Sequence, residues 1–116
     1  MVHQMPSKDE MLQQVIAALE AKIGTSNGVN ARWAYDLGAD GHICVDCISV
    51  PPRILREDCE ADARITMSLE DVWRVMTGEM DSQTAFTQGR VRLTGDMALI
   101  LKIDTLLGTY RAAQGA

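Results

Sequence analysis

The first part of the chain has apolar residues at helical spacing. Ser7 and Glu10 form the Ser-x-x-Glu pattern of a capping box, which predicts a helix start. Gly24 stands where a C-terminal cap is expected. The apolar positions between these signals are Met11, Leu12, Val15, Ile16, Leu19 and Ile23. Their spacing predicts an amphipathic helix whose stripe packs on another layer, most simply the face of a sheet.

The following segments alternate between apolar and polar residues. Val29 to Leu37 has clear period-two patterning, which predicts a strand with one buried and one solvent-facing side. Residues 38–41 are a turn, and a second strand runs from about His42 to Ser49. Pro51-Pro52 ends that strand, residues 53–55 are a short third strand, and the alternation around 63–67 predicts a fourth. Strands in one consecutive block favour a largely antiparallel sheet.

Helix caps return in the second half of the chain. Ser68 begins a predicted helix that ends at Gly78, and Asp81 begins a short one that runs toward Gln88. A fifth strand lies around 91–93, and Asp96 caps a final helix from Met97 to about Ala112. This order predicts an α+β fold, in which helices cover one face of a five-stranded, largely antiparallel sheet. Without repeats or linkers, residues 1–116 are expected to form a single domain.

The final helix has more apolar surface than one flat docking face needs. Its main arc consists of Leu99, Ile100, Ile103, Leu106, Leu107 and Tyr110. Met97 and Leu101 lie beside this arc and widen it in the first turns. The extra width needs a second apolar neighbour, which is another helix, another subunit or a lipid chain held between helix and sheet. The pattern alone leaves these alternatives open.

Net charge and composition reduce the number of functions that fit the sequence. The net charge of -5 argues against general binding to nucleic acid, and no apolar run reaches the ~20 residues that span a bilayer. The first residues lack the pattern of a secretory signal and the last residues are not a peroxisomal tripeptide, so we expect a cytoplasmic protein. Seven Met residues supply adaptable apolar surface. No nucleophile elbow or nucleotide-binding glycine motif occurs, so we expect neither an enzyme nor a bound cofactor.

Three cysteines raise the question of thiol chemistry. Cys44 and Cys47 form a Cys-x-x-Cys inside a strand-like run, where residues three apart point to opposite faces. A zinc site would need His42 and Cys59 as well, at irregular spacing. The odd number of cysteines argues against a secreted disulfide framework. We interpret the cysteines as structural, expect no metal, and keep a thiol redox protein using Cys44 and Cys47 as an alternative.

Two segments resemble a known family. Residues 61–81 resemble the fourth strand and following helix of sterol carrier protein 2 domains. Ala85-Phe86, Gln88 to Leu93, Gly95 to Leu99 and Lys102-Ile103 resemble the family pattern A-F-x-Q-G-K-L-K-I-x-G-N-M-x-L-x-x-K-L. The resemblance is strongest over 61–107. It implies five strands with helices over one face and a hydrophobic tunnel that binds sterols, fatty acids, acyl-CoA or phospholipids without covalent chemistry. The segment Ile48 to Pro52 departs from the family pattern.

On this resemblance, the function expected is low-selectivity binding and intracellular transfer of lipids. The candidate tunnel lining is Met76, Met80, Phe86, Val91, Leu93, Met97 and Leu101. Arg90 and Arg92 are candidates for the rim, where they would meet a carboxylate or phosphate. The rival interpretation is an accessory module that forms a homodimer or docks to an enzyme of lipid metabolism.

Overall fold

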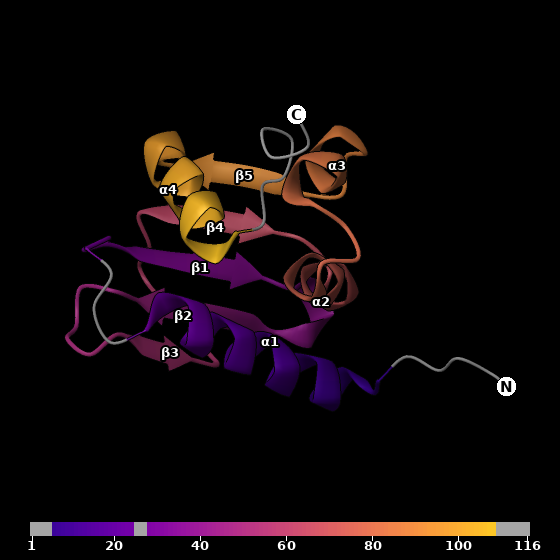
Figure 1. Cartoon of the computed structure of the whole chain (residues 1–116), viewed down its shortest axis with the longest axis horizontal. Coiled ribbons are helices and arrows are strands. Elements are labelled where there is room, and N and C mark those ends of the chain that lie inside the picture. Colours follow the sequence, from indigo (N-terminus) through magenta and orange to yellow (C-terminus); the bar gives the residue numbers. More distant parts are fainter. Residues whose placement is uncertain (1–5, 25–27, 109–116) are drawn as a thin grey trace, which may run out of the picture.

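Five strands form one mixed sheet in the order β3-β2-β1-β4-β5, in a computed structural model that describes residues 6–24 and 28–108 (Figure 1). The strands are β1 (Arg32–Asp36), β2 (His42–Asp46), β3 (Arg53–Leu55), β4 (Ala63–Thr66) and β5 (Arg92–Gly95). Three of the neighbouring pairs are antiparallel, as predicted, but β1 and β4 run parallel at the centre of the sheet. The α+β class and the five strands are confirmed.

The helices begin at the predicted caps. They are α1 (Lys8–Ile23), α2 (Leu69–Thr77), α3 (Ser82–Thr87) and α4 (Met97–Leu107). The side chains of Ser7, Ser68, Asp81 and Asp96 each accept a hydrogen bond from a backbone N–H of the first helical turn. Helix α4 ends at Leu107, where Gly108 adopts a left-handed conformation. The predicted helix end near Ala112 and the arc residue Tyr110 lie outside the described residues.

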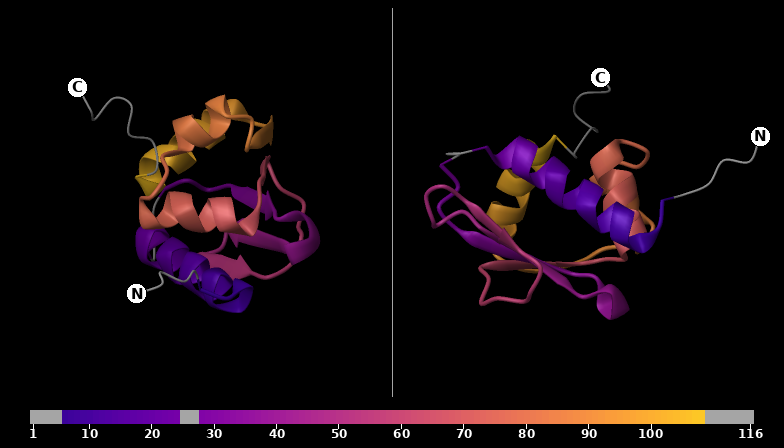
Figure 2. Two further views of the ribbon diagram at one scale, coloured as in Figure 1. Left: turned by 90° about the vertical axis from the view of Figure 1, so that its right-hand side faces the viewer. Right: turned by 90° about the horizontal axis from the view of Figure 1, so that it is seen from below.

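All of the helices lie on one side of the sheet (Figure 2, right). Trp33, Ile43 and Val45 project from β1 and β2 toward this side and are fully buried. The apolar stripe of α1 packs on them through Met11, Val15, Leu19 and Ile23. Leu99, Ile100, Ile103 and Leu107 of α4 belong to the same core. The core therefore lies in the layer between helices and sheet, which is also the layer that contains the candidate site.

The connection from β3 to β4 crosses the other side of the sheet. Because β4 pairs with β1 and not with β3, residues 56–62 must pass β2 and β1, and they do so on the face that carries no helix. We call residues 56–62 the crossover loop. Under it, Ala34 is fully buried, so the prediction that this side of β1 faces solvent is wrong at its centre. The alternation of apolar and polar residues along β1 does not show that a loop from a distant part of the chain covers one of its sides.

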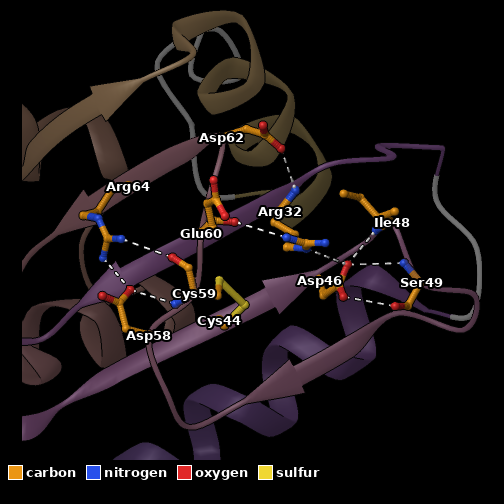
Figure 3. Close-up of a disulfide and its surroundings, with 10 residues drawn as sticks. All are labelled: Arg32, Cys44, Asp46, Ile48, Ser49, Asp58, Cys59, Glu60, Asp62 and Arg64. Carbon is orange, nitrogen blue, oxygen red and sulfur yellow. Dashed lines mark hydrogen bonds and ion pairs between the residues drawn. A yellow bond between two sulfur atoms is a disulfide. The ribbon is translucent and has the colours of Figure 1, made fainter.

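The crossover loop carries a disulfide that the sequence analysis did not predict. Cys59 of the loop is joined to Cys44 of β2, with 5.8 Å between the two Cα atoms (Figure 3). Cys47 is buried in the core on the helix side of the sheet and is not part of this bond. The expectation that Cys44 and Cys47 point to opposite faces agrees with this arrangement, and the two do not form a redox pair.

Asp46 organises the turn between β2 and β3. Its carboxylate accepts hydrogen bonds from the backbone N–H groups of Ile48 and Ser49 and from the Ser49 hydroxyl, at 3.0 to 3.2 Å. Desolvation raises the pKa of Asp46, but these hydrogen bonds and the nearby Arg32 outweigh it, so the pKa lies below its usual value of 3.8. The ordered turn holds Val50 83% exposed to solvent.

We expect the Asp46→Asn variant to melt at a lower temperature than the wild type at pH 7, and we expect this gap to narrow as the pH falls toward 3. A carboxylate whose pKa is lowered by folding stabilises the protein above its unfolded pKa, and this contribution is lost as the pH falls through the folded pKa. Thermal unfolding of both proteins from pH 3 to 7 measures the difference. A gap that is the same at every pH would contradict this account.

Candidate functional site

A cavity of about 200 Å³ lies between the sheet and the helices α2, α3 and α4. Its floor comes from the helix-facing residues of three strands, and its walls come from the inner faces of the helices. The lining residues are Tyr35, Ile65, Met67, Val72, Val75, Met76, Ser82, Gln83, Phe86, Val91, Leu93, Ile100, Leu101, Ile103, Asp104 and Leu107. The layer between sheet and helices is thus not filled by the protein's own side chains.

The cavity reaches the surface between α3 and α4. Phe86 of α3 and Leu101 of α4 both line it, yet they are 54% and 67% exposed. Large apolar side chains that are half in solvent and half over a cavity mark its mouth. The caps Asp81 and Asp96 fix where the two helices begin, and so which of their faces point inward. An apolar ligand could enter here without crossing a polar surface.

A few polar side chains interrupt the apolar lining. Burial, together with the nearby carboxylate of Asp104, raises the pKa of Tyr35 above its ordinary range, so the phenol stays protonated. The hydroxyl oxygen of Ser82 is buried and has no hydrogen-bond partner among the described residues. Burying a hydroxyl without a partner costs about 1–3 kcal/mol. Such a group is available to the polar end of a ligand.

The structure brings together most of the residues that the resemblance nominated. Met76, Phe86, Val91, Leu93 and Leu101 line the cavity. Met80 and Met97 do not belong to the lining: Met80 is half-buried, and Met97 is 51% exposed on the first turn of α4. Met67, which the sequence analysis did not nominate, supplies adaptable thioether surface together with Met76.

Arg90 and Arg92 lie outside this cavity. They line a separate groove that also contains the Val91 and Met67 side chains, so it adjoins the cavity wall. The Arg90 guanidinium is 3.3 Å from the buried carboxylate of Asp71, which Arg74 also approaches at 3.8 Å. Arg90 thus neutralises a buried charge in the first turn of α2, while Arg92 is exposed. A role for either residue at the rim stays a prediction.

Several lining residues lie on or directly after strands outside the C-terminal segment that carries the predicted lining. One is Tyr35, at an inward position of β1, and another is Ile65, at an inward position of β4. The third is Met67, which directly follows β4. Their apolar alternation was visible in the sequence. Which part of that face borders a cavity depends on how far α3 and α4 stand from the sheet, and no local pattern encodes this distance.

The described residues contain neither a metal-binding group nor a membrane span. Among residues 6–24 and 28–108, no three His, Cys, Asp or Glu side chains gather to hold a metal ion. In the same part of the chain, no helix has the length and hydropathy needed to cross a bilayer.

Comparisons with known proteins agree on one family. The family model described as the SCP-2 sterol transfer family matches residues 2–108. Sterol carrier protein 2 of Homo sapiens is 45% identical over 92 residues, which is 78% of this chain and 15% of the relative. Peroxisomal multifunctional enzyme A of Dictyostelium discoideum is 34% identical over 87 residues, 73% of this chain and 18% of the relative. The chain thus spans less than a fifth of the length of these curated relatives.

Solved structures share the fold. Sterol carrier protein 2 like 2 from Aedes aegypti superposes with a TM-score of 0.70 at 19% identity, covering 84% of this chain and 96% of that one. Sterol carrier protein 2 of Aedes aegypti, in complex with the C16 fatty acid palmitate, gives a TM-score of 0.66 at 20% identity, covering 91% and 99%. Fold and sequence match agree, and this chain belongs to the SCP-2 sterol transfer family.

Proposed function

We propose that this protein binds a lipid through its hydrocarbon part, which occupies the cavity under α3 and α4, and carries it without chemical change. The observation that supports this most directly is the cavity itself, which is apolar on most of its surface and has an apolar mouth at Phe86 and Leu101. The palmitate held by the Aedes aegypti relative supports a fatty acid as one ligand. The tunnel that the resemblance implies stays a prediction.

The hydrophobic effect alone is strong enough for such binding. Each methylene transferred out of water gains about 0.8 kcal/mol, so a chain of ~15 carbons gains on the order of 12 kcal/mol before association costs. The cavity of about 200 Å³ exceeds the ~150 Å³ of an engineered apolar cavity that binds benzene. It is smaller than the ~300–1,000 Å³ of typical ligand pockets. A long chain must therefore displace flexible side chains such as Met67 and Met76, or extend through the mouth.

The absence of demanding polar contacts implies low selectivity. The polar side chains of the lining include Gln83 and Asp104. Beside them, the neutral Tyr35 phenol and the Ser82 hydroxyl can each donate and accept a hydrogen bond to a polar head. A carboxylic acid, an ester and a sterol hydroxyl can all use such groups. The chemical class of the ligand is thus set by its hydrocarbon part.

Extraction of the purified protein with organic solvent, followed by lipid mass spectrometry, tests the proposal. We expect co-purified lipid near one molecule per chain, and saturable binding of a fluorescent fatty acid that palmitate displaces. After delipidation, the same titration should give one site. If no lipid is extracted and the fluorescent fatty acid does not saturate, the protein is not a carrier.

An accessory module is the second candidate, and the comparison with a multifunctional enzyme favours it. The relative from Dictyostelium discoideum carries the similar segment within a much longer chain. On this alternative, the domain fills its own cavity and uses an apolar edge to dock to an enzyme of lipid metabolism or to form a homodimer. Native mass spectrometry separates the two, since a lipid-free dimer supports the module and a lipid-bound monomer supports the carrier. The cytoplasmic location stays a prediction.

A further inference from the structure

The two sulfurs of the disulfide lie in different environments. Cys44 is 1% exposed in the middle of β2, whereas Cys59 is partly exposed in the crossover loop (Figure 3). Their Cα separation of 5.8 Å is within the usual range for a disulfide, so the two thiols can pair without moving the backbone. Cys59 is thus the half of the disulfide nearer to solvent, whereas Cys44 is shielded by the sheet.

Apart from this bond, polar contacts hold the crossover loop on the sheet. Its remaining residues are charged, with the exception of Ala61: Arg56, Glu57, Asp58, Glu60 and Asp62. The Arg32 guanidinium donates to the Glu60 carbonyl at 3.4 Å, and the Arg32 backbone N–H donates to the Asp62 carboxylate at 3.1 Å. Asp58 pairs with Arg64 at 2.8 Å, and Arg64 also donates to the Cys59 carbonyl at 3.3 Å. These are partly exposed contacts, and an exposed ion pair contributes little to stability. The disulfide at Cys59 is the covalent attachment of the loop to β2, and the other attachments named here are polar.

The end of the loop contacts the start of α4. The backbone N–H of Asp62 donates to the Arg32 carbonyl at 2.9 Å, and the Asp62 carbonyl accepts from the backbone N–H of Asp96 at 2.9 Å. Asp96 is the N-cap of α4, the helix that forms one wall of the cavity. The loop on one face of the sheet is thereby hydrogen-bonded to the helix that covers the other face.

We propose that the Cys44–Cys59 disulfide is a redox-sensitive switch that holds the crossover loop on the sheet and, through Asp62, secures the first turn of α4. A dithiol reductant supplies the two electrons. One of its thiolates attacks the Cys59 sulfur, the bond to Cys44 breaks, and the Cys44 sulfur leaves with the electron pair and takes up a proton. The second thiol then attacks the mixed disulfide, so that Cys59 leaves as a thiol and the reductant becomes a disulfide. Exchange with an oxidised small-molecule disulfide reverses the reaction.

Opening the switch leaves the rest of the domain folded. The hydrophobic core lies on the helix side of the sheet and contains neither Cys44 nor any residue of the crossover loop. A segment with few buried apolar contacts opens locally at low cost, while core segments need global unfolding. Reduction should therefore act on the loop and on the Asp96 amide, and not on the α1 core face. The proposal does not depend on lipid binding.

Amide hydrogen exchange on the delipidated protein, with and without dithiothreitol, tests the switch. We expect reduction to add about 2 Da and to raise the thiol count under denaturing conditions from one to three. Exchange of amides 57–61 should rise by at least about tenfold and that of Asp96 should also rise, while α1 amides change little. The Cys59→Ser variant should show the fast exchange without reductant, and the Cys47→Ser variant should respond like the wild type.

Four results would overturn the proposal. Three thiols in the protein before reduction would show that the sulfurs are not joined. Unchanged exchange in the loop, or unchanged exchange at Asp96, would show that the bond does not hold these parts in place. An equal rise throughout α1 would show global unfolding in place of a local switch. If the Cys47→Ser variant no longer responds to reduction, the response depends on Cys47 and not on the Cys44–Cys59 disulfide.

Discussion

Replacing Leu93 with tryptophan is expected to weaken binding of a fatty acid by roughly 10- to 50-fold, since two or three displaced methylenes are worth about 0.8 kcal/mol each. Leu93 lies opposite Ile65 in the sheet, and both line the cavity. An indole at this position takes up space that a ligand chain would use. It sits on an edge strand beside an existing void, so the added volume can be accommodated.

The adjacent Thr94 provides the matched control. It belongs to the same strand, is exposed, and faces the side of the sheet without helices, because side chains alternate along a strand. Titration of a fluorescent fatty acid into Leu93→Trp, Thr94→Trp and the wild type measures the difference. Thr94→Trp should bind like the wild type. Equal affinity in all three proteins, with Leu93→Trp folded by circular dichroism, would place the ligand elsewhere.

Replacing Gly95 with alanine should cost about 3 kcal/mol or more in the free energy of unfolding, from backbone strain together with steric overlap. Gly95 has a φ of +93°, and a Cβ atom there would lie 2.5 Å from the Asp62 carbonyl oxygen and 2.9 Å from the Ala63 Cα atom. Both neighbours are backbone atoms of the adjacent strand, so they cannot rotate away. Relief would require β5 to separate from β4.

The Gly89→Ala variant is the control that separates the cost of steric overlap at Gly95 from the cost of a positive φ. Its φ is +73°, but a Cβ atom there meets nothing within 4 Å, so Gly89→Ala should cost only about 1–2 kcal/mol. Urea denaturation of the two variants gives the free energies of unfolding. Similar losses for both variants would show that the close approach of β5 to Asp62 carries no energetic weight.

Local signals in the sequence predicted the elements well, because each helix start depends on a few neighbouring residues. Ser7, Ser68, Asp81 and Asp96 cap helices by hydrogen bonds that span three residues. Pairing between distant strands has no such signal. Consecutive strands predicted a largely antiparallel sheet, which three of the four pairs confirm, but the pattern did not show that β4 returns to pair with β1 in parallel.

The candidate site was predicted less completely for a related reason. Met97 was expected to widen the inner surface of α4, but it is 51% exposed outside the cavity lining, whereas Ile103 and Leu107 face inward. A helical wheel places residues around an axis and does not say how the helix is rotated over the sheet. Likewise, the pairing of Cys44 with Cys59 follows from the path of the crossover loop and not from cysteine spacing.

The central strand β1 obtains its two partners from very different distances along the chain. On one edge of β1, residue 33 pairs with residue 45 across a short hairpin. On the other edge it pairs with residue 63, which comes later in the chain than β2, β3 and the crossover loop. Closing a longer loop costs more chain entropy, so the β1–β2 hairpin is expected to form first. During synthesis on the ribosome, the open edge of β1 is therefore exposed to other chains until β4 has emerged, which makes the N-terminal half the stretch most in need of protection from aggregation.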